Sequence, residues 1–320
     1  MKLDTVQLTT SVDYLREFDK NKFYENDITR RNNNIKCHSL DNKPWGLETL
    51  SINETSGSII MKVNSKILGK DYSKSIQLNT LDQVLNSLNQ TGIKLDPSFL
   101  DDAAVREIHA TDDIRVFDPV ASILAFQHLL APKFIKTAYD HEGIVFKERI
   151  LQGLYTTVYN KFYQMSKDRK FFKQNPFLAK QFENMLRIES KLTRANLINK
   201  YTGGGSLPEI LSRDSPNGVI LNKIIAGQTL YKPDLLHNLS WKDQKDIGIA
   251  KLLFEHYNGN FELIKEHLRN QVGKNTKPNY LFNQYKAACF KLLNIENPNM
   301  FDSVLEVLAA LNNNNIEAAA

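Results

Sequence analysis

A run of alternating polar residues in the first half of the chain offers ligands for a metal ion. In VREIHATDDIRV, residues 105–116, strand alternation would place Glu107, His109, Thr111 and Asp113 on one face. Carboxylates and an imidazole on one sheet face can bind Mg²⁺ or Mn²⁺ and leave positions for water and phosphate oxygens. A solvent-exposed strand face, or a histidine paired with a neighbouring acid, remains the alternative interpretation.

A second run places tyrosines close to a lysine. In YTTVYNKFYQM, residues 155–165, alternation would put Tyr155, Tyr159, Lys161 and Tyr163 on one face. A tyrosine can attack a phosphodiester when a base removes its proton or a nearby cation lowers the pKa of its phenol. Tyrosine and threonine are also common strand residues, so the alternative is a structural role.

A third run, LRIESKL, puts Arg187, Glu189 and Lys191 on one strand face. A glutamate between two cations is compatible with an ion pair, a phosphate clamp or a third metal ligand. The residues alone leave these three interpretations open.

The order of these segments resembles a known family. VREIHATDDIRV is similar to an R-x-D-x-x-x-D strand, the tyrosine run to a Y-x-K strand, and MLRIESKLT to an R-x-E strand. SKILGKDYSKSIQLNTLDQVLNSLNQTGI precedes them and GSLPEILS follows them in the same order. From about Ile59 to Leu211 the chain resembles the rolling-circle replication initiation proteins of phages and plasmids, of the filamentous-phage nicking type and related to staphylococcal plasmid initiators.

This resemblance implies a metal-assisted transesterification on DNA. A tyrosine would attack the backbone at the origin, keep the 5′ phosphate as a covalent adduct and release a 3′-OH that primes synthesis. The implied roles are as follows: Tyr159 as nucleophile, Lys161 on the phosphate, His109, Asp113 and Glu189 around Mg²⁺ or Mn²⁺, and Arg187, Lys191, Lys167, Arg169 and Lys170 on the DNA.

Two positions depart from the family pattern. His109 stands where the first aspartate is usual, and Gln164 stands where the "YDKxxEM" form has glutamate. The first puts the ligand set in doubt, and the second removes an acidic role. Tyr155 and Tyr163 remain alternative nucleophiles.

The charge of the chain is concentrated in one stretch. The formal net charge is +5. Residues 155–200 contain ten basic and three acidic residues, so this stretch carries a net charge of +7 and the rest of the chain carries −2. A local excess of positive charge favours a polyanionic partner such as a DNA backbone. A solvated helical face rich in lysine is the alternative.

The elements that would position these residues are mixed helices and strands. A hairpin, a helix and a polar strand follow one another in this order twice. The repetition predicts an α+β fold with two related halves and antiparallel sheets. We expect the two halves to form one catalytic region over residues 1–202. After the glycines at 203–205, periodic segments predict a helical region over residues 203–320.

Several classes of protein are not expected. The 320 residues have no apolar run of membrane-spanning length and no apolar leader, and the two cysteines lack CxxC spacing. Phosphate-loop, GxGxxG, HExxH and GxSxG motifs do not occur. We therefore expect a globular protein of the bacterial host cytoplasm, with no membrane partner.

The expected partner is single-stranded or supercoiled origin DNA. A host helicase, a host polymerase and a second copy of the chain are further candidates. Two other functions remain open: a non-catalytic nucleic-acid-binding protein on the same scaffold, and a phage structural or assembly protein.

Overall fold

The computed structural model describes most of the chain. The described residues are 1–30, 33–40, 42–129, 131, 133–139, 142–150, 152–168, 170, 173, 175–225, 240–257, 261–271, 279–296 and 299–317. Arg169, one of the residues expected to bind DNA, lies outside them.

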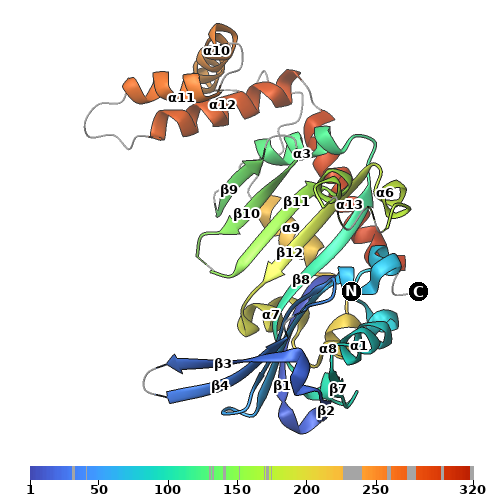
Figure 1. The fold of residues 1–320 in the computed structure, drawn as a ribbon. Coiled ribbons are helices and arrows are strands. Elements are labelled where there is room, and N and C mark those ends of the chain that lie inside the picture. Colours follow the sequence, from blue (N-terminus) through green and yellow to red (C-terminus); the bar gives the residue numbers. More distant parts are fainter. Residues whose placement is uncertain are drawn as a thin grey trace.

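One large antiparallel sheet organises the molecule (Figure 1). Its ten strands follow the order β3-β4-β5-β6-β1-β8-β12-β11-β10-β9, and β2 pairs separately with β7. The strands are β1 Leu3–Ser11, β2 Leu15–Phe18, β3 Phe23–Arg30, β4 Asn33–Leu40, β5 Leu47–Asn53, β6 Ser58–Asn64, β7 Ile93–Leu95, β8 Ala104–Arg115, β9 Phe134–Tyr139, β10 Gly143–Glu148, β11 Leu154–Asn160 and β12 Met185–Leu192.

Helices fill the connections and the C-terminal part. They are α1 Leu81–Asn89, α2 Phe99–Asp102, α3 Pro119–His128, α4 Lys161–Ser166, α6 Leu178–Gln181, α7 Ala195–Thr202, α8 Leu207–Leu211, α9 Asn217–Ile225, α10 Trp241–His256, α11 Phe261–Asn270, α12 Tyr280–Glu296 and α13 Asn299–Glu317. Four short 3₁₀ segments accompany them: η1 Val12–Tyr14, η2 Lys20–Lys22, η3 Ser65–Lys74 and η4 Leu78–Thr80. The predicted α+β class and the antiparallel sheet are confirmed.

The polar strands of the sequence lie at the centre of the sheet. β8 pairs with β12, which places Asp113 opposite Arg187 and His109 opposite Lys191. β11 follows on the other side of β12 and places Tyr159 opposite Arg187. The three runs singled out in the sequence are therefore three adjacent strands.

Alternation along these strands gives the sheet two different faces. Ile108, Ala110, Leu186 and Ile188 are fully buried and belong to the main core. Helices α3, α7, α9 and α13 contact β8, β11 or β12. The odd-numbered residues of β8, β11 and β12 point to the opposite face, where η3, α4 and α6 cover only part of the sheet.

The strand predicted to run through Met165 is wrong beyond Asn160. The side chain of Asn160 accepts a hydrogen bond of 3.1 Å from the backbone N–H of Tyr163 and so caps α4. Lys161 and Tyr163 consequently lie on a helix, and neither shares the strand face of Tyr159.

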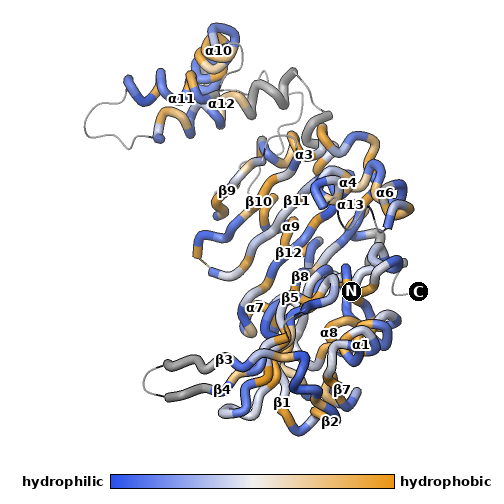
Figure 2. The backbone as a smooth tube through the Cα atoms, in the orientation of Figure 1, coloured by the Kyte–Doolittle hydropathy of each residue, from blue (hydrophilic) through white to orange (hydrophobic). Residues whose placement is uncertain are grey.

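The packing of the C-terminal region differs from the expected division at residue 203. Residues of α8, α9 and α13 are part of the main core that covers the sheet. Helices α10–α12 have a separate small core that includes Ala250, Ile264 and Tyr285. Figure 2 shows hydrophobic residues along α10, where Leu252 and Phe254 are exposed. Of the expected helical domain, only α10–α12 has its own core.

The helices of the described chain give no sign of a membrane span, since none combines the length and the apolar character that crossing a bilayer requires.

The position of α13 in the main core leads to a stability prediction. Leu311 is buried at 2% exposure, so Leu311→Ala should lower the free energy of unfolding by about 2–5 kcal/mol. Leu305→Ala on the same helix is the control, because Leu305 is 37% exposed and should lose less than about 1 kcal/mol. Urea denaturation followed by circular dichroism measures both, and equal losses would contradict the packing of α13.

Candidate functional site

A hydrogen bond between Tyr159 and Glu189 lies at the centre of the polar face. The Tyr159 hydroxyl donates to Glu189 Oε2 at 3.0 Å across the β11–β12 pair. Gly143 of β10 is opposite Tyr159, and a Cβ at this glycine would approach the Tyr159 Cβ to 2.8 Å. The absence of a side chain at Gly143 therefore leaves room for the tyrosine.

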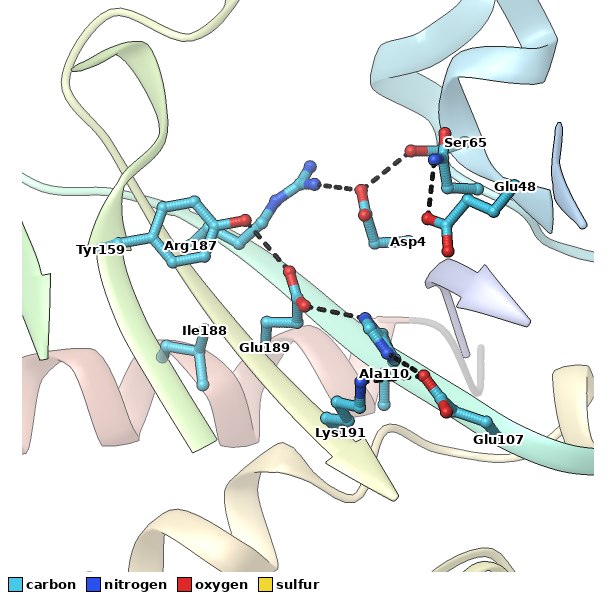
Figure 3. A network of polar contacts seen from close by, with 12 residues as sticks. Asp4, Glu48, Ser65, Glu107, Ala110, Tyr159, Arg187, Ile188, Glu189 and Lys191 are labelled. Atoms are coloured by element: carbon cyan, nitrogen blue, oxygen red, sulfur yellow. Dashed lines mark hydrogen bonds and ion pairs between the residues drawn. The ribbon is translucent and has the colours of Figure 1, made fainter. Parts of the chain in front are cut away.

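Glu189 also belongs to a network of charged side chains, drawn in Figure 3, which we call the charged network. The other oxygen of Glu189 is 3.0 Å from His109 Nδ1, and His109 Nε2 is 2.8 Å from Glu107 Oε1. Lys62 and Lys191 each pair with Glu107 at 3.0 Å. Tyr159 is thus connected through side chains to the N-terminal strands.

The charges of this charged network stabilise one another. Burial alone would lower the pKa of His109, but the hydrogen bonds and charges of Glu189 and Glu107 outweigh it and raise that pKa above its ordinary value. Burial would raise the pKa of Glu107, yet Lys62, His109 and Lys191 hold it at about 2. The two carboxylates therefore favour the protonated form of the imidazole between them.

Tyr159 needs a base if it is to act as a nucleophile. Burial, followed by the negative charge of Glu189, raises the pKa of the Tyr159 phenol well above its ordinary value. At neutral pH the phenol is protonated, and Glu189 is the carboxylate that accepts its hydrogen bond.

Lys161 lies beside Tyr159 but is buried. Its ammonium is 5.7 Å from the centre of the Tyr159 ring, donates to the Tyr72 hydroxyl and to Gln164 Oε1 at 3.2 Å, and is 1% exposed. Burial and the nearby Arg187 lower the pKa of Lys161 to about 7. This placement differs from the expected contact with a phosphate.

Arg187, which is fully buried, forms a second cluster with two half-buried carboxylates. Its guanidinium donates to both carboxylate oxygens of Asp113 at 2.5 Å and to Asp4 at 2.8 Å. Ser65 donates to the same oxygen of Asp4 at 2.8 Å. Arg187 is 0% exposed, so in this structure it joins β12 to β8 and β1 and does not face a DNA ligand.

The structure brings together two of the three expected metal ligands. His109 and Glu189 are in contact, whereas Asp113 is paired with Arg187, four residues and about 13 Å further along β8. In the described part of the chain, no three His, Cys, Asp or Glu side chains form a group that could hold a metal ion. Mg²⁺ is commonly held by one or two carboxylates together with waters and substrate phosphates, and of the three expected ligands Glu189 is the carboxylate that lines the pocket beside Tyr159.

A pocket opens beside the tyrosine. It has a volume of about 280 Å³ and is lined by Tyr139, Glu142, Gly143, Thr157, Tyr159, Tyr163, Gln164, Lys167 and Glu189. Tyr163 faces it from α4, while Tyr155 is not among the lining residues and lies under Lys147, at 5.4 Å. Of the three candidate tyrosines, Tyr159 combines the pocket with a hydrogen bond to a carboxylate.

The lysines expected to bind DNA differ in exposure. Lys167 lines the pocket, pairs with Glu142 and has a side chain that is 56% exposed. Lys170 is exposed, and the Lys191 side chain is 35% exposed while it pairs with Glu107. Lys167 and Lys170 are therefore positioned on the surface, whereas Lys191 is part of the charged network around Glu107.

Sequence reasoning missed several contributors to the site. Asp4 reaches Arg187 at an irregularity of register between Leu3 and Thr5 of β1, and Tyr72 reaches Lys161 from η3. Neither position shows a signal in the sequence, because both contacts depend on tertiary packing.

No protein-family model matches the chain, and no curated protein shows significant similarity to it.

The pKa of Asp4 leads to a prediction about acid stability. Burial would raise this pKa, but Lys161 and Arg187 lower it to about 2 in the folded chain. A carboxyl whose pKa is lower when folded stabilises the protein above its unfolded pKa, and this stabilisation is lost as the pH falls from about 4 to about 2. Asp4→Asn should lower the free energy of unfolding by about 2 kcal/mol at pH 7, and its difference from the wild type should shrink at pH 3.

Urea denaturation at pH 7, 5 and 3 measures this effect. Asp101→Asn on α2 is the control, because Asp101 is exposed and its replacement should change stability by less than about 0.5 kcal/mol. A constant difference between Asp4→Asn and the wild type across this range would contradict the role of the Asp4 charge.

Proposed function

We propose that this protein is a rolling-circle replication initiator that nicks single-stranded origin DNA with Tyr159. The observation that carries the proposal is the 3.0 Å hydrogen bond from the Tyr159 hydroxyl to Glu189, in the wall of a pocket with Lys167 on its rim. The order of motifs that resembles nicking initiators supports it independently.

The chain's own groups account for the reaction. Glu189 accepts the phenolic proton while the Tyr159 oxygen attacks the phosphorus. A bond forms between this oxygen and phosphorus, and the bond from phosphorus to the 3′ oxygen breaks. The 3′ oxygen takes up a proton, so the products are a 5′-phosphotyrosine and a free 3′-OH.

Two neighbours position the reacting carboxylate and phenol. His109, held by Glu107, orients Glu189 toward Tyr159 and limits its conformations. Arg187, opposite Tyr159 on β12, supplies positive charge that favours the phenolate that forms during attack.

Glu189 and His109 are the residues that would hold Mg²⁺ or Mn²⁺. The ion would polarise the scissile phosphate and offset its charge. Because both ring nitrogens of His109 contact carboxylates, ion binding there would have to replace one of these two contacts.

The wider features of the proposal follow from the sequence. In this proposal the two halves of the sheet are related in architecture. The exposed Lys167 and Lys170 contact the DNA backbone. The reaction takes place in the host cytoplasm. Helicase and polymerase of the host act downstream of the nick, and a second copy of the chain is a further candidate partner.

A non-catalytic nucleic-acid-binding protein is the second candidate function. The observation that favours it is the mutual pairing of Glu107, His109 and Glu189, since ion networks of this kind also occur as purely structural features. Covalent capture distinguishes the two functions.

Replacing the proposed nucleophile gives the most direct prediction. The protein is incubated with Mn²⁺ and 3′-labelled single-stranded oligonucleotides, either from the replicon that encodes it or of random sequence. Wild type should give a labelled adduct on a denaturing gel, because the 5′ phosphate of the labelled fragment stays on the tyrosine. Tyr159→Phe should abolish this adduct.

Tyr155→Phe and Tyr163→Phe are the matched controls and should keep at least about one tenth of the adduct. An adduct that persists in Tyr159→Phe would place the nucleophile elsewhere. No adduct from wild type with any of the oligonucleotides would favour the non-catalytic function.

The base is tested separately. Glu189→Gln keeps the size of the side chain but cannot accept the phenolic proton as a carboxylate, so the single-turnover rate should fall by about 10²- to 10⁴-fold. Glu183→Gln, in the exposed turn before β12, is the control and should react at the wild-type rate. Equal rates for Glu189→Gln and wild type would exclude Glu189 as the base.

A further inference from the structure

A second and larger pocket lies away from Tyr159. It has a volume of about 770 Å³, and we name it the Trp45 pocket after the indole on its wall. Its described lining residues are Asn21, Lys22, Leu40, Asn42, Lys43, Pro44, Trp45, Lys66, Ile67, Gly69, Ser87, Gln90 and Thr91.

The lining of this pocket combines basic, amide and aromatic side chains. Lys22, Lys43 and Lys66 are basic, and none of the described lining residues is acidic. Asn21, Asn42 and Gln90 offer amide donors and acceptors, which match the polar edges of bases. Trp45 is 41% exposed and presents an aromatic surface of the kind on which unpaired bases stack.

The segment that carries Trp45 is held firmly against η3. Gly46 has φ +85°, and a Cβ at this position would be 2.0 Å from the backbone nitrogen of Ile67. The Gly46 carbonyl accepts a hydrogen bond of 2.7 Å from the backbone N–H of Asn64. The indole is therefore presented from a fixed backbone, which lowers the entropic cost of binding.

The Trp45 pocket and the tyrosine site share a structural element. Ser65, at the start of η3, donates to Asp4, and Asp4 accepts from Arg187 (Figure 3). The next residue, Lys66, lines the Trp45 pocket and pairs with Asp168, which follows α4. One strand of nucleic acid in the pocket would thus be held by the same element that supports Arg187.

We propose that the Trp45 pocket binds an unpaired nucleotide of single-stranded DNA, with its base stacked on Trp45 and its phosphates beside Lys22 and Lys43. The identity of the ligand as DNA rests on the proposed nicking function. The pocket is a holding site for the strand outside the reacting phosphodiester, because Tyr159 and Glu189 belong to a different pocket.

The two tryptophans of the chain make the test specific. Trp241 is the second tryptophan and lies on α10, so Trp241→Phe leaves Trp45 as the only indole. Adding the oligonucleotide dT20 to this variant in EDTA should quench its fluorescence in a saturable way. The apparent affinity should fall as salt increases.

Binding variants define the contacts. Trp45→Ala should bind fluorescein-labelled dT20 about 5- to 150-fold more weakly in anisotropy titrations. Lys22→Gln and Lys43→Gln should each reduce the slope of log affinity against log salt by about 0.7. Lys242→Gln, on the exposed surface of α10, is the matched control and should leave the slope unchanged.

Two results would overturn the inference. One is unchanged Trp45 fluorescence at dT20 concentrations that saturate the anisotropy signal. The other is equal quenching by heparin, because a polysaccharide has charge but no bases to stack.

The outcome is separable from that of the nicking proposal. Quenching of Trp45 without any covalent adduct would support the pocket and remove the nicking function. If Trp45→Ala forms the adduct at the wild-type rate and binds dT20 with wild-type affinity, the result would support nicking and contradict DNA binding in the Trp45 pocket.

Discussion

The buried ion pair between Arg187 and Asp113 is the interaction on which the rest of the structure depends. It spans the central strands β8 and β12, and a second carboxylate, Asp4, brings β1 into the same contact. A guanidinium that is 0% exposed would be strongly destabilising without such partners, so these three strands are held in one register. That register sets Glu189 opposite Thr111 of β8, and Tyr159 reaches Glu189 from β11 on the other side of β12.

The polar face of the sheet has two regions, one around Arg187 and one around Glu189, which differ in how their charges are paired. Around Arg187, the ions are paired directly with one another, and the guanidinium itself is 0% exposed. Around Glu189, the pairing runs through the imidazole of His109, whose pKa Glu189 and Glu107 raise against the effect of burial. The first region joins three strands, and the second contains the groups that we propose move a proton during nicking.

Much of this arrangement could be predicted from the sequence, and the reasons for the failures are physical. Alternation in residues 105–116 and 186–192 correctly placed Glu107, His109 and Glu189 on one face, because strand periodicity is local. The role expected of Asp113 failed because its partner is distant in sequence: Arg187, 74 residues later, pairs with it. Lys161 was misplaced for a local reason, since the helix cap at Asn160 ends the strand one residue before it.

The return of α13 to the main core has a consequence for how the chain folds as it is synthesised. Residues of α9 and α13 share one apolar core, yet α10–α12 lie between them in sequence and have a core of their own. On a ribosome, the sheet and the α10–α12 unit can each form in order, but the covering layer of the sheet is incomplete until residues 299–317 have emerged. During that interval the apolar surface that later meets Val304 and Val307 is open to water, which makes it a natural binding surface for chaperones.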